Sequence, residues 1–437
     1  MFKNKLTRFA IPTALAFGLV ACGDDSKKSN PNTPSANTIV DVAIQSGSFT
    51  TLVGALQATG LDEALRGDGP FTVFAPTDAA FELLPAGLVA SLDSETLSAI
   101  LSYHVAAGKV AAEQVVGLSE AESLQGDKID IAVMGGTVVL DGRVQVTRTD
   151  IMADNGIIHI IDSVLIPGAF PGTVVDALIA SPRFSDLVGA VVGADLAATL
   201  SDSNANYTVF APSNDGFARL PDGLVGSLDK DTLGAVLKYH VLGSKVDAAA
   251  AIAADGMSVP TLLSDSDIFV SVDGTVVLDG RSQVEYTDIM TSNGIIHILD
   301  SVLVPGDFPG TIVDALASYP RFETLVGAVV QQNLAETLSD TMGSGFTVFA
   351  PTNSAFAPVD LSSISSSDLT SILTFHVLPE PKDSEAVTGT DAHATVQGSE
   401  LPISGTTLNG QAEITFVDIN TTNGIVHVID GVLVPNL

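Results

Sequence analysis

The sequence is poor in cysteine, tryptophan and basic residues, and each shortage excludes a class of structure or partner. Cys22 is the only cysteine among 437 residues, so no internal disulfide can form and the domains must be stabilised by apolar cores. Tryptophan is absent and aromatic residues make up 5% of the chain, which disfavours a stacking platform for sugars or single-stranded nucleic acid. The net charge of −33 repels nucleic acid and anionic lipid surfaces, so we expect no nucleic-acid partner.

The sequence also lacks the short motifs of common catalytic sites. It contains no GxSxG elbow, no GxxxxGK(S/T) phosphate loop and no dinucleotide glycine pattern after a strand. Residues 202–206 (DSNAN) begin like a calcium loop, but Tyr207 replaces the turn glycine and Ser213 the bidentate glutamate. We therefore expect no catalytic residues, no metal site and no cofactor, and loose calcium binding through the general acidity stays open.

The N-terminus has the features of an export signal. Residues 1–8 carry three basic side chains and no acidic one, and residues 9–20 are almost wholly apolar. This apolar run is shorter than the roughly 20 residues that a spanning helix needs. Residues 1–21 are thus predicted to be a signal peptide. Residues 22–37 contain no large apolar side chain and predict a disordered tether.

Three signatures recur in the remaining chain, in the same order and at nearly constant spacing. TVFAP occurs at residues 72, 208 and 347, with offsets of 208 − 72 = 136 and 347 − 208 = 139. An aromatic residue followed by His-Val recurs at 103, 239 and 375, and an Asn-Gly block with a histidine recurs at 155, 293 and 423. This period is too long for a solenoid unit of about 20–50 residues. We predict three complete domains, at residues 38–167, 172–305 and 310–435.

Each repeat predicts helices in its first half and strands in its second. Apolar residues recur at helical spacing in 39–43 and 49–56, and a strand at 71–75 is followed by Thr77, a suitable helix N-cap. A further helix is predicted at 94–103. Gly-Gly, Asp-Gly and Asn-Gly turns then separate β-branched runs, which is typical of hairpins, at residues 129–133, 137–140, 144–147 and 157–161. The predicted fold class is α+β.

Two proline-bounded segments join the predicted domains, at residues 167–172 (PGAFPG) and 305–310 (PGDFPG). Two prolines in six residues restrict the backbone. Phe170 and Phe308 at their centres are expected to pack against a neighbouring domain. We predict short, semi-rigid joints, and flexible joints are the alternative.

Together the three signatures resemble the fasciclin domain family. The TVFAPT(D/N)xAF, tyrosine-histidine and NGxIHxIDxVLxP blocks match its motifs in triplicate over residues 38–435. The resemblance implies an α+β fold in which helices pack on a wedge-shaped β-sheet core. It also implies a role in adhesion or matrix interaction. The third copy departs at Phe375, which replaces tyrosine, and at residues 379–383.

The residues before Cys22, Leu-Val-Ala, resemble the lipobox of bacterial lipoproteins. The resemblance implies cleavage before Cys22 and lipid attachment to it, so that the membrane is a partner through the anchor. Gly23 resembles the pattern that is sorted to the outer membrane. We expect an exported protein at the outer membrane or cell surface, and a periplasm-facing position stays open, as does an ordinary signal peptide with a chance cysteine.

Six of the seven histidines form three pairs, one pair in each repeat. They are His104 with His159, His240 with His297, and His376 with His427. Each pair could be a metal site or an acid–base couple. The preferred interpretation is a buried polar network, because no third ligand of the HExxH type appears. The helix end before His104 is expected to favour its protonated ring.

A second set of candidates comes from the position after the capping residue. A short polar side chain there can bond nearby backbone, which is the preferred interpretation. The family resemblance implies ligand or receptor contact at this position and at the tyrosine-histidine block. The candidate binding residues are therefore Asp78, Tyr103, His104, Asn214, Tyr239, His240, Asn353 and His376.

The leading functional hypothesis is a non-enzymatic, lipid-anchored surface protein. It would adhere to matrix, polysaccharide or other cells through weak contacts that three linked domains add together. One alternative is a carrier of a small molecule or lipid in a pocket between sheet and helices. Another is a hydrolase or lyase that acts on envelope polymers.

Overall fold

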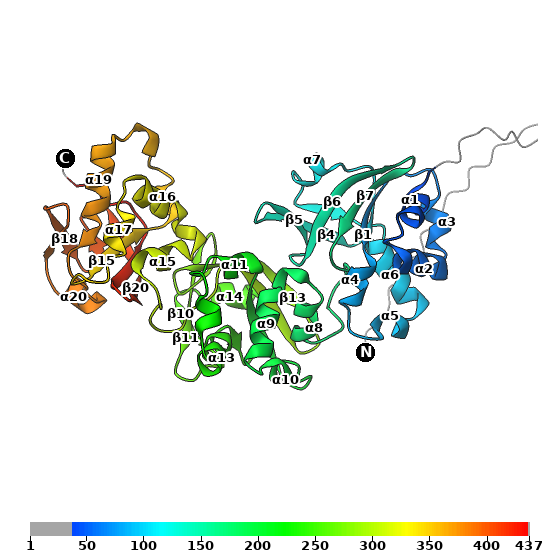
Figure 1. The fold of residues 1–437 in the computed structure, drawn as a ribbon, viewed down its shortest axis with the longest axis horizontal. Coiled ribbons are helices and arrows are strands. Elements are labelled where there is room, and N and C mark those ends of the chain that lie inside the picture. Colours follow the sequence, from blue (N-terminus) through cyan, green and yellow to red (C-terminus); the bar gives the residue numbers. More distant parts are fainter. Residues whose placement is uncertain (1–36, 436–437) are drawn as a thin grey trace, which may run out of the picture. The chain divides into compact units, whose positions relative to one another are not determined.

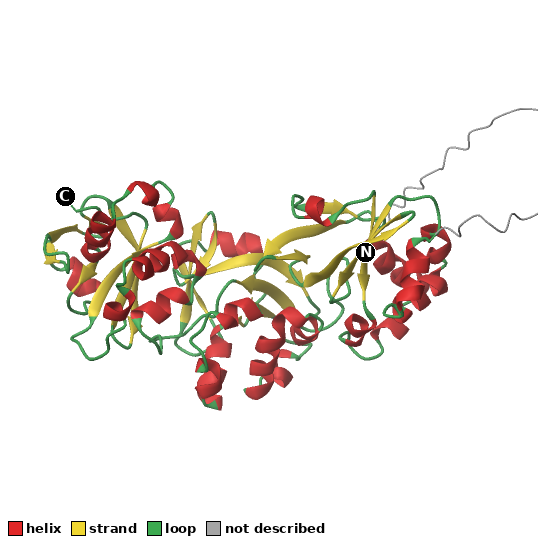
Figure 2. Cartoon of the chain, turned by 45° about the horizontal axis from the view of Figure 1, so that its top comes forward, coloured by secondary structure: helices red, strands yellow, loops and turns green. Residues whose placement is uncertain are grey.

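The computed structural model describes residues 37–435, which contain three successive domains of mixed helix and strand (Figure 1). The predicted signal peptide, Cys22 and nearly all of the tether lie outside the described residues. Each domain has one seven-stranded sheet with helices packed on it, and Figure 2 shows red helices and yellow strands in every domain. The predicted α+β class is confirmed. None of the helices in this part of the chain is long and apolar enough to cross a membrane.

Domain 1 begins with helices and continues into strands, as its sequence predicts. Its helices are α1 (Ile39–Ser46), α2 (Thr50–Thr59), α3 (Leu61–Leu65), α4 (Asp78–Glu82), α5 (Leu88–Ser91), α6 (Ser94–Tyr103) and α7 (Ala112–Val115). Its strands are β1 (Phe71–Pro76), β2 (Val105–Ala107), β3 (Glu120–Glu122), β4 (Lys128–Met134), β5 (Thr137–Leu140), β6 (Val144–Ala153) and β7 (Gly156–Ile161). Thr77 caps α4 by accepting the N–H of Ala80, and Asp93 caps α6 by accepting the N–H of Thr96.

The sheet of domain 1 has the strand order β2-β1-β7-β6-β5-β4-β3. Strands β3 to β7 pair antiparallel in succession, and β4 to β7 form the hairpins that the turns predict. The pairing of β1 with β7 is parallel, and it aligns Phe71 with Gly156 and Pro76 with Ile161. This pair joins the first and last strands of the domain, and it places TVFAP beside the strand that carries His159.

Each sheet separates two apolar clusters. In domain 1, Val73 and Ala75 of β1 face the cluster formed by α1, α2 and α6, and Phe74 between them faces the opposite cluster. Figure 1 shows α1, α2, α3 and α6 gathered beside β1. This alternation explains why nearly the whole of β1 is buried, since both of its faces are covered.

Domains 2 and 3 repeat this plan. Domain 2 comprises α8 (Val174–Ile179), the 3-10 helix η1 (Pro182–Phe184), α9 (Ser185–Gly193), α10 (Ala197–Leu200), β8 (Tyr207–Pro212), α11 (Asn214–Ala218), α12 (Leu224–Ser227), α13 (Lys230–Tyr239), β9 (Val241–Leu242), α14 (Ala248–Ala253), β10 (Met257–Pro260), β11 (Asp267–Asp273), β12 (Thr275–Leu278), β13 (Ser282–Met290) and β14 (Gly294–Leu299). Domain 3 comprises α15 (Ile312–Ala317), η2 (Pro320–Phe322), α16 (Glu323–Gln331), α17 (Ala335–Leu338), β15 (Phe346–Pro351), α18 (Asn353–Phe356), η3 (Leu361–Ser363), α19 (Ser366–Phe375), β16 (Val377–Leu378), α20 (Ser384–Thr388), β17 (Ala392–Ala394), β18 (Glu400–Ser404), β19 (Thr407–Leu408), β20 (Ala412–Thr421) and β21 (Gly424–Ile429). The first strand of each again pairs in parallel with the last.

The central phenylalanine of each joint is buried, as expected. Phe170 packs in the core of domain 2, and its N–H donates to the carbonyl of Met290. Phe308 donates its N–H to the carbonyl of Asn420 in domain 3. Each joint therefore adds a backbone hydrogen bond and a buried ring to the domain that follows it.

Four buried arginines, which we call the junction arginines, lie at the two joints. They are Arg143 and Arg183 at the first joint, and Arg281 and Arg321 at the second. Arg183 donates through Nη1 to the carbonyl of Gly142 at 2.7 Å, and Arg321 donates through Nη1 to the carbonyl of Gly280 at 3.1 Å. The same contact thus recurs at both joints. Because a buried guanidinium must find acceptors, it ties two domains together at one turn.

Candidate functional site

The three histidines that follow a helix, which we call the helix-end histidines, are buried and bonded to backbone at both ring nitrogens. They are His104, His240 and His376. In domain 1 the Nδ1 of His104 lies 2.8 Å from the carbonyl of Ile100, and its Nε2 accepts the N–H of Leu165 at 2.9 Å. The other two repeat this geometry. One donor and one acceptor nitrogen describe the neutral ring.

Burial therefore overrides the expected effect of the helix end. Desolvation lowers the pKa of each helix-end histidine to about 4, against an ordinary value of 6.5. The expectation of a protonated ring is wrong. Besides this desolvation, the ring nitrogen facing away from the helix needs its lone pair to accept a buried backbone N–H, and protonation would break that bond.

The other three histidines, which we call the strand histidines, lie in the last strand of each sheet. They are His159, His297 and His427. His159 Nε2 lies 2.9 Å from the carbonyl of Val110, and its Nδ1 accepts the N–H of Asp150 at 3.3 Å. Asp150 has a φ of 59° and lies within the register shift of β6 and β7 between Arg148 and Ile151. The histidine thus anchors a β-bulge.

All six paired histidines therefore satisfy a buried backbone network. Within residues 37–435 no group of three histidine, cysteine, aspartate or glutamate side chains is placed to hold a metal ion. A free lone pair for general-base chemistry is also lacking on the helix-end rings, because backbone N–H groups use it.

The cap residues, Asp78, Asn214 and Asn353, act on a helix that is distant in the sequence. Asp78 accepts the N–H groups of Thr50 and Thr51 at the start of α2, at 3.1 and 2.7 Å. Asn214 and Asn353 accept one N–H each from the start of α9 and α16. These three helices have no side-chain cap of their own. Backbone donors lower the pKa of Asp78 to about 2.

The tyrosines of the tyrosine-histidine block are buried beside a carboxylate. The Tyr103 hydroxyl lies 2.8 Å from the carbonyl of Lys128 and 3.0 Å from Asp141 Oδ2. The Tyr239 hydroxyl donates to Asp279 Oδ2 at 2.7 Å. Burial raises the pKa of Asp141 to about 6. Asp141 and Asp279 directly precede Gly142 and Gly280, whose carbonyls accept hydrogen bonds from the arginine of the next domain.

A tyrosine, an aspartate and a junction arginine of the preceding domain lie close together at each joint. In domain 2 the Nη2 of Arg281 lies 3.8 Å from Asp279 Oδ2, and its guanidinium stacks over the Tyr319 ring of domain 3 at 5.6 Å. The equivalent positions of domain 3 carry Phe375, Asn409 and Gln411. All three members are therefore replaced together in domain 3. Domains 1 and 2, which each contact a following domain, keep all three.

At each joint, the domain that follows supplies an aromatic ring that packs on the turn glycine of the domain before it. Tyr286 of domain 2 covers Gly142, where an added Cβ would lie 2.4 Å from its ring, and Phe416 of domain 3 covers Gly280. Domain 1 has Ser48 where Arg183 stands in domain 2, and Arg148 where Tyr286 stands. The candidate tyrosines thus belong to a network of the joints.

An asparagine that we did not select as a candidate holds each domain together. Asn293, which is fully buried, accepts the N–H of Val174 at 2.9 Å and donates to the carbonyls of Leu200 and Asp202 at 2.9 and 3.0 Å. Asn155 and Asn423 make the same three bonds in their own domains. Its recurrence before glycine in all three copies was the available signal.

Comparison with known proteins agrees with this threefold framework. The model of the fasciclin domain matches residues 47–167, 182–305 and 320–435. The chain belongs to the fasciclin domain family, and it contains three copies of the domain.

The chain is similar to long animal proteins of the same family. It is 29% identical over 418 residues to transforming growth factor-beta-induced protein ig-h3 of Sus scrofa, which covers 91% of this chain and 58% of that protein. It is 31% identical over 385 residues to human periostin, which covers 85% of this chain and 44% of that protein. The chain thus spans about half the length of these relatives. A solved FAS1 domain pair from the insect cell adhesion molecule fasciclin I is 19% identical, with a TM-score of 0.35, and covers 59% of this chain and 97% of that one.

Proposed function

We propose that the chain is a non-enzymatic surface protein that adheres to matrix, polysaccharide or other cells and is anchored by lipid at Cys22. The observation that supports it most is the presence of three fasciclin domains with one framework in a single chain. Weak contacts at equivalent faces of linked domains raise the overall affinity through effective concentration, without any single strong site.

The arrangement of the candidate residues fits a binding role for the surface rather than for these side chains directly. The helix-end histidines and both tyrosines are buried, and the cap residues are half-buried and hold helix ends. Their part in adhesion would be to fix the loops and helices around them. The partner would contact exposed groups, as most recognition by loops on a rigid scaffold does.

The charge of the chain suggests what kind of partner is favoured. With 51 acidic residues against 18 basic ones, the surface repels other anionic polymers. A cationic partner, or an anionic polysaccharide bridged by calcium, would overcome this repulsion. Adhesion is therefore expected to weaken in high salt, which screens exposed charges.

The test is a strain that lacks the gene, complemented with wild type or with Cys22→Ala. Attachment to a surface and cell aggregation are counted. We expect the deletion to reduce both, the wild-type gene to restore them, and the Cys22→Ala gene to release protein without restoring them. Equal attachment of deletion and wild type would reject adhesion, whereas full rescue by Cys22→Ala would reject only the lipid anchor.

A further inference from the structure

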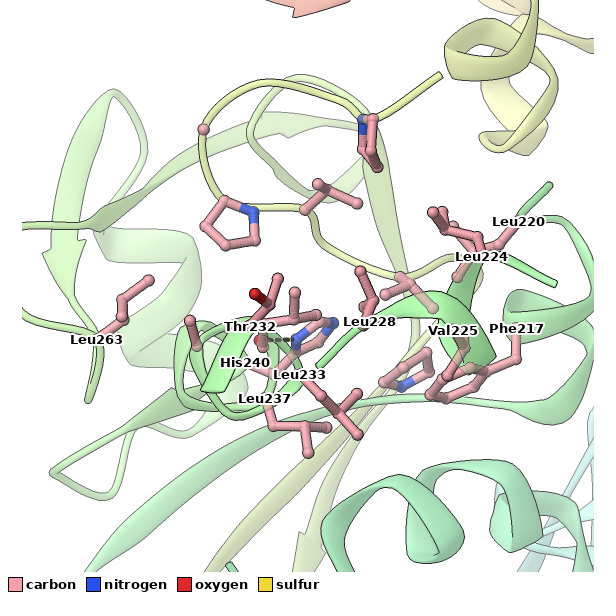
Figure 3. A pocket seen from close by; sticks show the side chains of 18 of the residues that line it. Phe217, Leu220, Leu224, Val225, Leu228, Thr232, Leu233, Leu237, His240 and Leu263 are labelled. Atoms are coloured by element: carbon pink, nitrogen blue, oxygen red, sulfur yellow. Dashed lines mark hydrogen bonds between the residues drawn. The ribbon is translucent and has the colours of Figure 1, made fainter. Parts of the chain in front are cut away.

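Domain 2 contains an apolar cavity between its helices and the segment that leads to domain 3. Its volume is about 410 Å³. Phe217, Leu224 and Val225 line it from α11 and α12, and Leu233 and Leu237 line it from α13 (Figure 3). Val302, Val304, residues 305–307 and Pro309 line it from the segment after the last strand. The volume falls within the range of about 300–1,000 Å³ of small-molecule sites.

The lining selects against charged ligands. Its polar side chains are Thr232, His240, Ser266 and Asp307, and it contains no lysine or arginine. His240 is neutral and already bonded at both nitrogens. Figure 3 shows the bond of its Nδ1 as a dashed line. An anionic headgroup inside the cavity would find no counter-charge and would lie near Asp307. Water would find few partners on the apolar walls.

Domain 1 shows that the fold does not require this cavity, whereas domain 3 has a somewhat smaller one. The equivalent position encloses about 20 Å³ in domain 1 and about 320 Å³ in domain 3. At two lining positions the size of the side chain increases as the volume decreases. They are Ile100 and Ile166 in domain 1, Ile372 and Val434 in domain 3, and Val236 and Val304 in domain 2.

The cavity is therefore largest where both positions are valine and intermediate where one of them is isoleucine. It is nearly closed where both positions are isoleucine. The neighbouring framework is shared, since Leu101, Leu237 and Leu373 lie at one position and a helix-end histidine follows each. Two methyl groups do not account for the whole difference. They mark the positions at which a side chain can fill the space between the helix and the segment after the last strand.

We propose that the domain 2 cavity is a binding site for a neutral, apolar small molecule, such as an alkyl alcohol or an aromatic hydrocarbon of two or three rings. An apolar cavity of about 150 Å³ accepts benzene, and this one is between two and three times as large. The proposal does not depend on adhesion, because the apolar walls from α11, α12 and α13 are buried or half-buried side chains. It would give domain 2 a ligand that domain 1, with the same fold, cannot take.

The test is a fluorescence titration of the full chain with N-phenyl-1-naphthylamine, a neutral apolar probe. All proteins carry Val434→Ile, so that domain 3 matches domain 1 at both positions. We expect saturable binding of one probe per chain, and at least tenfold weaker binding in the Val236→Ile/Val304→Ile protein. Dodecanol should compete with the probe at least tenfold better than dodecanoate.

The matched control is Ile100→Val/Ile166→Val in domain 1, added to the Val236→Ile/Val304→Ile protein. It should restore part of the binding, because it gives domain 1 the valines of domain 2. Circular dichroism and the unfolding temperature verify that each variant is folded. Absence of saturable binding in the starting protein would overturn the proposal, and so would undiminished binding in a folded Val236→Ile/Val304→Ile protein.

Discussion

Replacing Arg183 with alanine should uncouple the first two domains. Arg183 is 3% exposed, and it donates to the Gly142 carbonyl at 2.7 Å and to Glu285 Oε2 at 2.9 Å. Hydrogen bonds to charged groups contribute about 1.5–3 kcal/mol each, and breaking a buried ion pair costs about 3–5 kcal/mol. The Glu285 side chain is 29% exposed, so water would solvate it after the loss of its partner. We therefore expect a loss of about 3 kcal/mol, below the sum of these terms.

The assay is thermal unfolding of the full chain, followed by calorimetry. At about 2–4 °C per kcal/mol for a unit of this size, the transition of domains 1 and 2 should fall by about 6–12 °C. The matched control is Arg66→Ala, since Arg66 forms an ion pair with Asp41 but its side chain is 38% exposed. An exposed pair contributes about 0–1 kcal/mol, so this shift should stay below about 4 °C.

A local measurement separates coupling from general destabilisation. The Phe170 N–H bonds the Met290 carbonyl at the first joint, and the Phe308 N–H bonds the Asn420 carbonyl at the second. Arg183→Ala should speed hydrogen exchange at Phe170 and leave Phe308 unchanged. If Arg183→Ala and Arg66→Ala lower the unfolding temperature equally, or if both amides respond alike, the joint does not depend on this arginine.

Three further outcomes follow from the buried networks. The helix-end histidines should remain neutral by NMR from pH 8 to 5.5; because their folded pKa of about 4 lies below 6.5, the stability that they contribute is complete above pH 6.5 and is lost as the pH falls toward 4. Asn293→Ala removes the three hydrogen bonds of a fully buried side chain and should cost about 3 kcal/mol in denaturant unfolding, whereas Asn204→Ala, at an exposed position, should change stability by about 0.5 kcal/mol or less. Tyr239→Phe should cost about 2 kcal/mol of stability, because it removes the hydrogen bond to Asp279. Adding Asp279→Asn should recover part of this loss, since domain 3 combines Phe375 with Asn409 at the same positions. A double variant as unstable as the sum of the single ones would contradict the pairing.

Local signals in the sequence were sufficient for most elements of the fold. The helix at residues 94–103 was predicted with the bounds of α6, because apolar residues recur at helical spacing along it. The hairpins of β4 to β7 follow from Gly-rich turns. The parallel pairing of β1 with β7 was not predicted, since it joins residues about eighty apart and no local pattern encodes such a pair.

The candidate site shows the same limit at the level of side chains. The interpretation that Asp78 bonds nearby backbone was correct about its chemistry, but the backbone lies 27 and 28 residues earlier in the sequence. The charge of the helix-end histidines was predicted wrongly, because a helix end acts locally whereas the deciding N–H comes from a residue about sixty positions away. Sequence repetition pointed to the histidines and to Asp78 but not to the asparagine before glycine, and only the fold identified the partners of all of them.

Differences among the three copies are therefore more informative than their similarities. Residues shared by all copies, such as the histidines and the asparagine before glycine, make the same contacts inside each domain. The tyrosine, aspartate and arginine below the joints are present in two copies and replaced together in the third. A set of residues that changes as a unit is under a common constraint, and here the shared contact is the buried turn that receives the next domain's arginine. By the same reasoning, valine at both of these cavity positions is a difference that belongs to domain 2 and not to the fold.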